Sequence, residues 1–210
     1  TTNTDGTSVV VPMSHVILRT MAYNDQVAYQ WFAPAGFSRG VVQNATSVGY
    51  IDKTTGEYNS VIMSQGLRDT AYVNKINPVA YMPNKGLAVY GQKTLHSAAS
   101  ALDRINVRRL FITLEKAIST ASKFQLFEFN DEFTRAQFVN MVEPFLREIQ
   151  GRRGITDFKV VCDTSNNTGQ IIDTNSFVGD IYVKPARSIN YIQLNFIAAR
   201  TDVSFSEIGG

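Results

Sequence analysis

Apolar residues recur at three- and four-residue steps between Asn106 and Lys123, which is the pattern of an amphipathic helix. Charged residues fall mostly on the opposite face. The pattern predicts a long helix that begins between Ser97 and Asp103, ends near Lys123 and packs by one face. The positions on that face are Leu110, Phe111, Leu114, Ala117, Ile118, Ala121 and Phe124.

A second helix is expected after Asn130-Asp131, following an extended apolar run over residues 125–129. Thr134 and Gln137 have the spacing of a capping box. Pro144 predicts a kink or break inside this helix, and Gly151 and Gly154 are expected to end it. Its apolar stripe consists of Phe138, Val142, Phe145, Leu146 and Ile149.

Alternating apolar and polar residues predict strands elsewhere. A turn is expected at Asn24-Asp25, a hairpin turn at 84–86 with positive φ at Gly86, and a short helix around 67–73. The order of elements predicts an α+β fold, with a mixed or antiparallel sheet packed by two long helices and with extended terminal arms. The expected strands are 9–23, 79–83, 86–91, 157–163, 177–185 and 190–200.

Composition and charge narrow the class of protein. The 210 residues are 44% hydrophobic and 18% charged, which is typical of a globular protein with a sizeable core. A net charge of +2 is too small to argue for nucleic-acid binding. No apolar run approaches the roughly 20 residues needed to span a bilayer, and no secretion signal opens the chain, which starts without Met.

The single cysteine, Cys162, excludes an internal disulfide and fits a reducing compartment. We expect it to be a small buried strand residue. The aromatic segment at residues 29–40 is expected to be a packed loop with bends at Pro34 and Gly36. It could line a ligand pocket, but plugging the edge of a core is the favoured interpretation.

Candidate catalytic and ligand sites are weak. The segment from Gly86 to Thr94 resembles a phosphate-binding loop, but an extra residue precedes Lys93 and the residues between the glycines are strand-like. Glu128 and Asp131 could do acid–base work in a cleft, although acidic residues at the start of a helix favour its positive end. His15 and His96 are isolated. No catalytic residue, cofactor or metal is therefore expected.

Arginines form the clearest charge feature. Arg152 and Arg153 sit between glycines at an expected helix end. A solvated face is one interpretation, and contact with an acidic protein surface is the other, because Arg forms forked pairs with carboxylates. The members of this set are Arg104, Arg108, Arg109, Arg147, Arg152 and Arg153.

Several segments in order resemble contractile phage tail sheath proteins, most closely those of the T4-like group. The segments are YNDQVAYQWFAPAGFSRG, GLAVYGQKTL, NVRRLFITLEKAI, FEFNDEFTRAQF and PARSINYIQLNFIA. The resemblance covers most of residues 15–200, the conserved C-terminal or core region. Members of the family usually carry extra outer domains, so the short length is consistent with a core fragment.

The resemblance implies a virion structural protein that polymerises as stacked hexameric rings around the tail tube and contracts to drive the tube through the host envelope. It implies assembly in the host bacterial cytoplasm and partners that include neighbouring sheath subunits, the tube protein, and baseplate and tail terminator proteins. No enzymatic activity, direct nucleic-acid contact or membrane insertion is implied. Arg147, Arg152 and Arg153 are candidate tube contacts.

We expect the blocks of such a polymer to be tied together by strand addition, in which an extended arm completes a neighbour's sheet edge. This divides the chain into an N-terminal arm (1–14), a core (15–200, with possible subregions 15–90 and 91–200) and a C-terminal arm (201–210). Two alternatives stay open: a sheath of a bacterial contractile injection system, and an α+β hydrolase that uses Glu128 and Asp131. The arm residues are Val9, Val10, Val11, Val203, Ser204, Phe205, Ser206 and Ile208.

Overall fold

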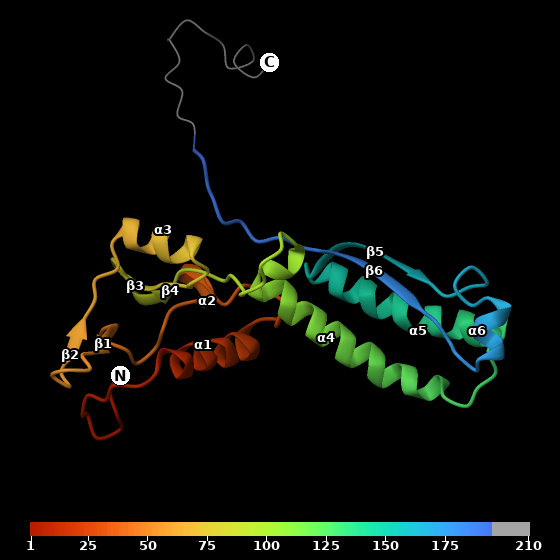
Figure 1. Ribbon diagram of the computed structural model, residues 1–210, viewed down its shortest axis with the longest axis horizontal. Coiled ribbons are helices and arrows are strands. Elements are labelled where there is room, and N and C mark those ends of the chain that lie inside the picture. Colours follow the sequence, from red (N-terminus) through yellow and green to blue (C-terminus); the bar gives the residue numbers. More distant parts are fainter. Residues whose placement is uncertain (195–210) are drawn as a thin grey trace, which may run out of the picture.

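The structure of the protein is a computed structural model, which describes residues 1–194. A hairpin of two long helices forms one end of the molecule (Figure 1). The helices are α4 (Ile105–Ser122) and α5 (Glu132–Gly151). A short 3-10 helix, Ala101–Asp103, leads into α4, and another, Lys123–Gln125, follows it. Both predicted long helices are confirmed, although α4 begins later than expected.

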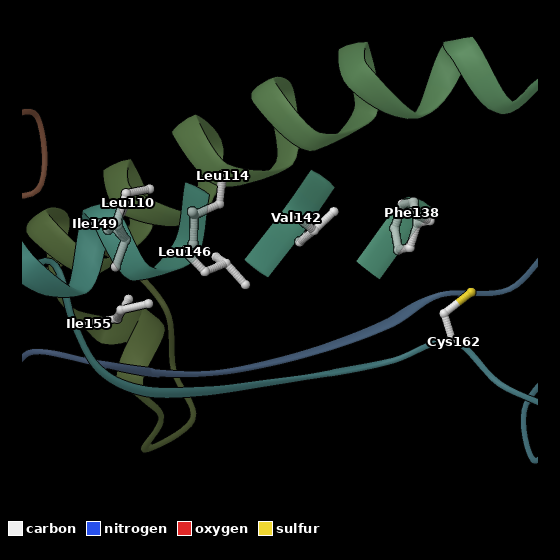
Figure 2. Close-up of a cluster of buried hydrophobic side chains, with 8 residues drawn as sticks. All are labelled: Leu110, Leu114, Phe138, Val142, Leu146, Ile149, Ile155 and Cys162. Carbon is white, nitrogen blue, oxygen red and sulfur yellow. The ribbon is translucent and has the colours of Figure 1, made fainter. Parts of the chain in front are cut away.

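One apolar core holds this helical lobe together. Leu110 and Leu114 of α4 face Val142 and Leu146 of α5 (Figure 2). The strand β5 (Ile155–Val161) packs along α5, with antiparallel β6 (Asp180–Pro185) beside it. The short helix α6 (Gly169–Asp173), which the sequence analysis did not predict, lies between these strands in the chain. The buried residues of this core are Leu110, Leu114, Phe138, Val142, Leu146, Ile149, Ile155 and Cys162.

The other lobe contains shorter elements arranged around a smaller core (Figure 1). Helix α3 confirms the predicted short helix, and the β3–β4 hairpin confirms the turn, with φ of 61° at Asn84 and 78° at Gly86. The elements are α1 (Met13–Val27), α2 (Gly36–Arg39), β1 (Gly49–Ile51), β2 (Tyr58–Ser60), α3 (Gln65–Val73), β3 (Val79–Met82) and β4 (Gly86–Val89).

The described residues mix helices with three separate two-stranded antiparallel sheets, β1–β2, β3–β4 and β5–β6. This is an α+β arrangement, but the strands found up to residue 194 do not join into a single mixed sheet. Residues 190–194 of the predicted last strand have no regular secondary structure. None of the helices in the described part is long and apolar enough to cross a membrane.

The predicted strand over 9–23 and the turn at Asn24-Asp25 are wrong, because helix α1 covers most of that range. Its buried positions are Val16, Thr20 and Asn24, which are spaced by four and therefore lie on one helix face. The Thr20 hydroxyl donates to the Val16 carbonyl one turn earlier. Two of the three core-facing residues are polar, so the apolar periodicity that identifies a helix is missing.

Two details of α5 and one of the segment before it also differ from expectation. Its N-cap is Asp131, whose carboxylate accepts a hydrogen bond from the Thr134 amide, so the predicted capping box at Thr134 and Gln137 is wrong. The helix continues through Pro144, so of the predicted kink or break the break does not occur. Residues 125–129 are not extended, because a 3-10 turn includes Gln125 and Phe127 has a φ of 72°.

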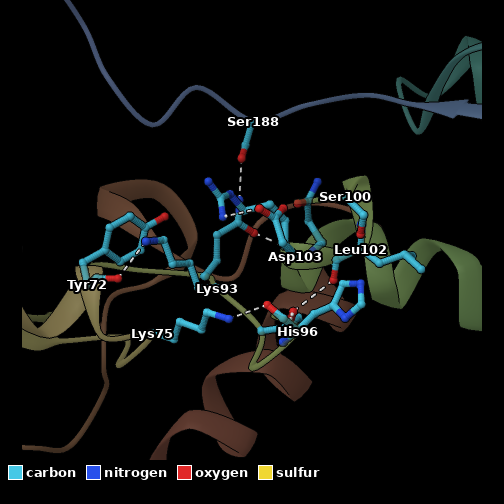
Figure 3. Close-up of polar contacts among 12 residues, drawn as sticks. Tyr72, Lys75, Lys93, His96, Ser100, Leu102, Asp103 and Ser188 are labelled. Carbon is cyan, nitrogen blue, oxygen red and sulfur yellow. Dashed lines mark hydrogen bonds and ion pairs between the residues drawn. The ribbon is translucent and has the colours of Figure 1, made fainter. Parts of the chain in front are cut away.

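A polar network joins the two lobes where α4 begins. The Lys93 ammonium donates to the Tyr72 carbonyl and the Lys75 ammonium to the His96 carbonyl (Figure 3). The Gln92 side chain donates to the Ser188 hydroxyl, which ties the chain after β6 to the chain before α4. Lys93 therefore anchors the inter-lobe segment. Gly86–Val89 forms strand β4, as the strand-like residues after Gly86 indicated when a phosphate-binding loop was rejected.

Candidate inter-subunit docking site

The β5–β6 sheet has only two strands, and each strand is paired on one side only among the described residues. The register runs from Ile155 opposite Pro185 to Val161 opposite Asp180, with a bulge between Ile155 and Asp157. Backbone groups on the unpaired side of a strand are available to another extended chain. The sheet therefore offers edges where a further strand can add.

An apolar groove of about 540 Å³ lies between α4 and β6. On the β6 side the lining residues alternate along the chain, so they point to one face of the sheet. On the helix side they follow the α4 stripe that the sequence predicted. The apolar lining is Phe111, Leu114, Ile118, Phe138, Phe177, Ile181 and Val183.

The groove exists because two strands are too narrow to cover two helices. The core of the lobe buries Leu110 and Leu114 of α4, whereas Phe111 and Ile118 stay half-buried beside β6. Gly179 contributes to the wall, and a Cβ there would lie 2.7 Å from Cε1 of Phe138. An added strand along β6 would extend the sheet over the uncovered part of α4.

A buried amide holds the start of β6 in place. Asn167 is only 2% exposed; its Oδ1 accepts from the Val178 amide and its Nδ2 donates to the Val178 carbonyl. The Cys162 thiol donates to the same carbonyl. Cys162 is buried, as the sequence predicted, but it lies one position beyond β5 and not in the strand. Its burial raises the pKa of the thiol.

The carboxylates of the hydrolase alternative lie outside the groove. Glu128 and Asp131 are both exposed, on the loop between α4 and α5. The hydrogen bonds from Thr134 hold the pKa of the Asp131 carboxyl below its usual range. A cap residue with a lowered pKa favours the ionised form, which is unsuited to donating a proton near neutral pH.

The predicted N-terminal arm lies on its own lobe in this structure. The Val9 amide donates to the Thr1 carbonyl, and Thr2 forms an isolated bridge with Ser8. Val9 and Val10 are exposed, while Val11 packs against the smaller core. The predicted C-terminal arm residues, Val203, Ser204, Phe205, Ser206 and Ile208, lie outside the described residues.

The predicted tube-contact arginines gather at the end of α5. Arg147 and Arg152 form ion pairs with Glu143 and Glu148 one turn earlier. The Arg152 guanidinium also lies over the Tyr29 ring at 4.9 Å. Arg153 is exposed in a left-handed conformation with φ of 63°.

Trp31 plugs the edge of the helical core, as the favoured sequence interpretation predicted. Its indole packs against that core, and Nε1 donates to the Arg152 carbonyl at 3.1 Å. Tyr29 stacks on it at 4.8 Å between ring centroids. The groove beside β6 was missed as a site. The alternation of Phe177, Ile181 and Val183 indicates an apolar sheet face but not that this face stays uncovered.

Residues 97–199 match the family of the phage tail sheath C-terminal domain. The chain is 48% identical over 200 residues to a tail sheath protein of Vibrio phage KVP40, covering 95% of this chain and 28% of the relative. It is 41% identical over 200 residues to that of Enterobacteria phage T4, covering 95% and 29%. The chain thus spans less than a third of the length of these curated relatives.

Solved structures share the fold at low identity. The contracted sheath complex of the extracellular contractile injection system PVC aligns with a TM-score of 0.75 and 21% identity, over 91% of this chain and 52% of that one. The contracted helical sheath of the anti-feeding prophage aligns with a TM-score of 0.75 and 20% identity, over 91% and 52%.

Proposed function

We propose that this chain, whose residues 97–199 match the phage tail sheath C-terminal domain family, is the docking core of a contractile tail sheath subunit. In the proposed role it links subunits into stacked hexameric rings around a tail tube. Contraction of that polymer drives the tube through the host envelope. The identities of 48% and 41% to phage sheath proteins favour a phage sheath over that of a bacterial injection system.

The observation that carries the proposal is the incomplete β5–β6 sheet beside the half-covered α4. A neighbour's arm, residues 204–208, would add to the free edge of β6 by main-chain hydrogen bonds. Its apolar side chains would enter the groove lined by Phe111, Ile118 and Ile181. Burial of one Phe side chain there would contribute about 1.5–3 kcal/mol, and the N-terminal arm residues 8–11 would supply a second link.

Strand addition suits a machine whose blocks must move without separating. Main-chain hydrogen bonds tolerate changes in the flanking linker, because they do not depend on a tight side-chain fit. The contact of Arg147, Arg152 and Arg153 with an acidic surface, for which the tube is the predicted partner, is of a different kind. Exposed ion pairs are worth about 0–1 kcal/mol each, which fits a contact that is released during contraction.

No catalysis is part of the proposed function. The relatives are tail sheath proteins, and the carboxylates of the hydrolase alternative are exposed on a loop. The proposed stroke therefore comes from re-docking of subunits. The baseplate and tail terminator proteins are the proposed partners at the two ends of the polymer.

A pair of matched substitutions on α4 tests the docking site. Ile118→Gln places an amide in the groove, whereas Ile112→Gln changes an exposed residue of the same helix outside it. We expect the first to reduce polymerisation strongly and the second to leave it unchanged, as measured by sedimentation velocity and electron microscopy. Deletion of residues 201–210 should act like Ile118→Gln. Normal polymers from both the deletion and the Ile118→Gln chain would refute the proposal.

A further inference from the structure

The loop that joins α4 to α5 exposes an unusual amount of aromatic surface. Phe127 is fully exposed, and Phe129 and Phe124 are 83% and 80% exposed. Apolar patches of this kind on a protein surface mark interaction sites. We define the aromatic tip as Phe124, Leu126, Phe127, Phe129 and Phe133.

The aromatic tip is also acidic. Glu128, Asp131 and Glu132 are exposed within it, and Lys123 is the single exposed cation between residues 123 and 133. Arg135 is buried in the first turns of α5 and donates to the Asn130 carbonyl and side chain. The tip therefore presents aromatic rings surrounded by a surplus of negative charge.

The opposite end of the helical hairpin has the complementary character. The start of α4 and the end of α5 lie together at the junction of the lobes (Figure 1). The arginines of these two helix ends are therefore on the same part of the molecule. The Ala186 amide donates to the Gly154 carbonyl, which brings Arg187 close to Arg153. We define the basic end as Tyr29, Arg108, Arg152, Arg153 and Arg187, all of them exposed.

The two ends of one chain cannot meet. Helix α4 has 18 residues, which corresponds to a length of about 27 Å. Within the basic end, Arg108, Arg153 and Arg187 have no ion-pair partner among residues 1–194. Arg152 already lies over the Tyr29 ring, so this surface accommodates arginine and aromatic groups together. A matching surface must come from another molecule.

We infer that the aromatic tip of one copy docks on the basic end of a second copy, head to tail. This rests on the proposed function as a polymer subunit, and it gives Arg152 and Arg153 a second copy in place of the tube as their acidic partner, so that Arg147 alone stays a tube-contact candidate. The carboxylates pair with arginines that are free in the single chain, and the phenyl rings stack on guanidinium and tyrosine faces. A heterologous contact of this kind repeats to give a ring or a helix.

Mixtures of chains that each carry one added cysteine test the contact directly. The natural thiol, Cys162, is buried, so Phe127→Cys and Arg153→Cys chains with tags of different length each carry one reactive site. On mild oxidation we expect the mixed Phe127→Cys and Arg153→Cys dimer to dominate, and its yield to fall severalfold at high salt because screening weakens the charge attraction. Ile62→Cys, at an exposed site outside both surfaces, is the control.

The same mixture prepared from chains without residues 201–210 separates this contact from strand addition. Survival of the mixed dimer there supports an independent tip contact, even if polymers are lost. A Glu128→Arg change in the Phe127→Cys chain should lower the yield, and Arg187→Glu in the partner chain should restore it. The inference is overturned if Phe127→Cys pairs equally with Ile62→Cys, pairs mainly with itself, or cross-links only to added tube protein.

Discussion

Arg109 of α4 holds Asp25 of α1 in an ion pair in which Nη2 lies 2.5 Å from both carboxylate oxygens. The side chains are 18% and 29% exposed, respectively, so water screens the pair only in part. The other terminal nitrogen of Arg109, Nη1, is buried without a hydrogen-bond partner in the described part of the chain. The ion pair links the lobe that contains α1 to the helical hairpin.

We therefore expect Asp25→Asn to lower the free energy of unfolding by about 1–3 kcal/mol, because it leaves a half-buried guanidinium without its counter-charge. Chemical denaturation followed by circular dichroism measures the change. Asp69→Asn, at an exposed position in α3, is the matched control and should be close to neutral. Adding Arg109→Met to Asp25→Asn should recover part of the loss. Equal stability of the two Asn variants would contradict the role of the pair.

The cap of α5 should give a pH-dependent stability. Hydrogen bonds from Thr134 lower the pKa of the Asp131 carboxyl below the model-compound value of 3.8. A carboxyl whose folded pKa is lowered stabilises the fold above its unfolded pKa and loses that contribution as the pH falls through the folded value. The advantage of the natural chain over Asp131→Asn, which retains a cap but does not titrate, should therefore begin to shrink as the pH falls below about 3.8 and be lost below the folded pKa.

Loss of the cap itself is tested at neutral pH. Asp131→Ala removes the acceptor for the Thr134 amide and should lower Tm by about 2–4 °C, whereas Asp131→Asn should lower it less. Calorimetry at pH 7 and pH 3 on the three chains measures both effects. A Tm of Asp131→Ala that equals that of the natural chain would show that the cap contributes nothing.

The helical hairpin was predictable because the apolar residues of both helices recur with the period of an α-helix. Leu110 and Leu114 repeat with the helical step, and the same side chains are buried in the structure. The β3–β4 hairpin was predictable because Asn84 and Gly86 tolerate the positive φ that its turn requires. In both cases a local rule and the tertiary contacts agree.

Helix α1 was missed because its buried stripe contains Thr20 and Asn24, and polar residues there hide the helical period. The groove could not be predicted from its lining alone, because Phe111 and Ile118 have the same pattern as the buried core positions. What leaves them half-covered is the narrow β5–β6 sheet, a property of the whole lobe. Strand number depends on partners outside the local sequence, so periodicity cannot supply it.

Gly179 should be a sensitive point of the groove wall. A Cβ there would lie 2.7 Å from the buried Phe138 ring, so Gly179→Ala should force the ring to shift and cost about 1–3 kcal/mol in the free energy of unfolding. Gly169→Ala is the control, since a Cβ at that position meets nothing within 4 Å. Denaturant titration of both chains decides the point. Similar stabilities would mean that the ring moves into the groove without cost.

Substitution of Phe127 is expected to have opposite effects on the stability of the chain and on its association with other copies. Its φ of 72° is unfavourable for a residue with a Cβ, and its ring is fully exposed. Phe127→Gly should therefore raise the free energy of unfolding by about 0.5–1 kcal/mol, the relief of strain less the entropy cost of glycine. Phe129→Gly, at an exposed tip position whose φ is not positive, should be neutral or destabilising. Both changes should weaken association of the chains in sedimentation velocity, because each removes a ring of the aromatic tip. A Phe127→Gly chain that is less stable than the natural one would show that the ring contributes to the fold of its own chain, and that the left-handed conformation does not serve the docking surface.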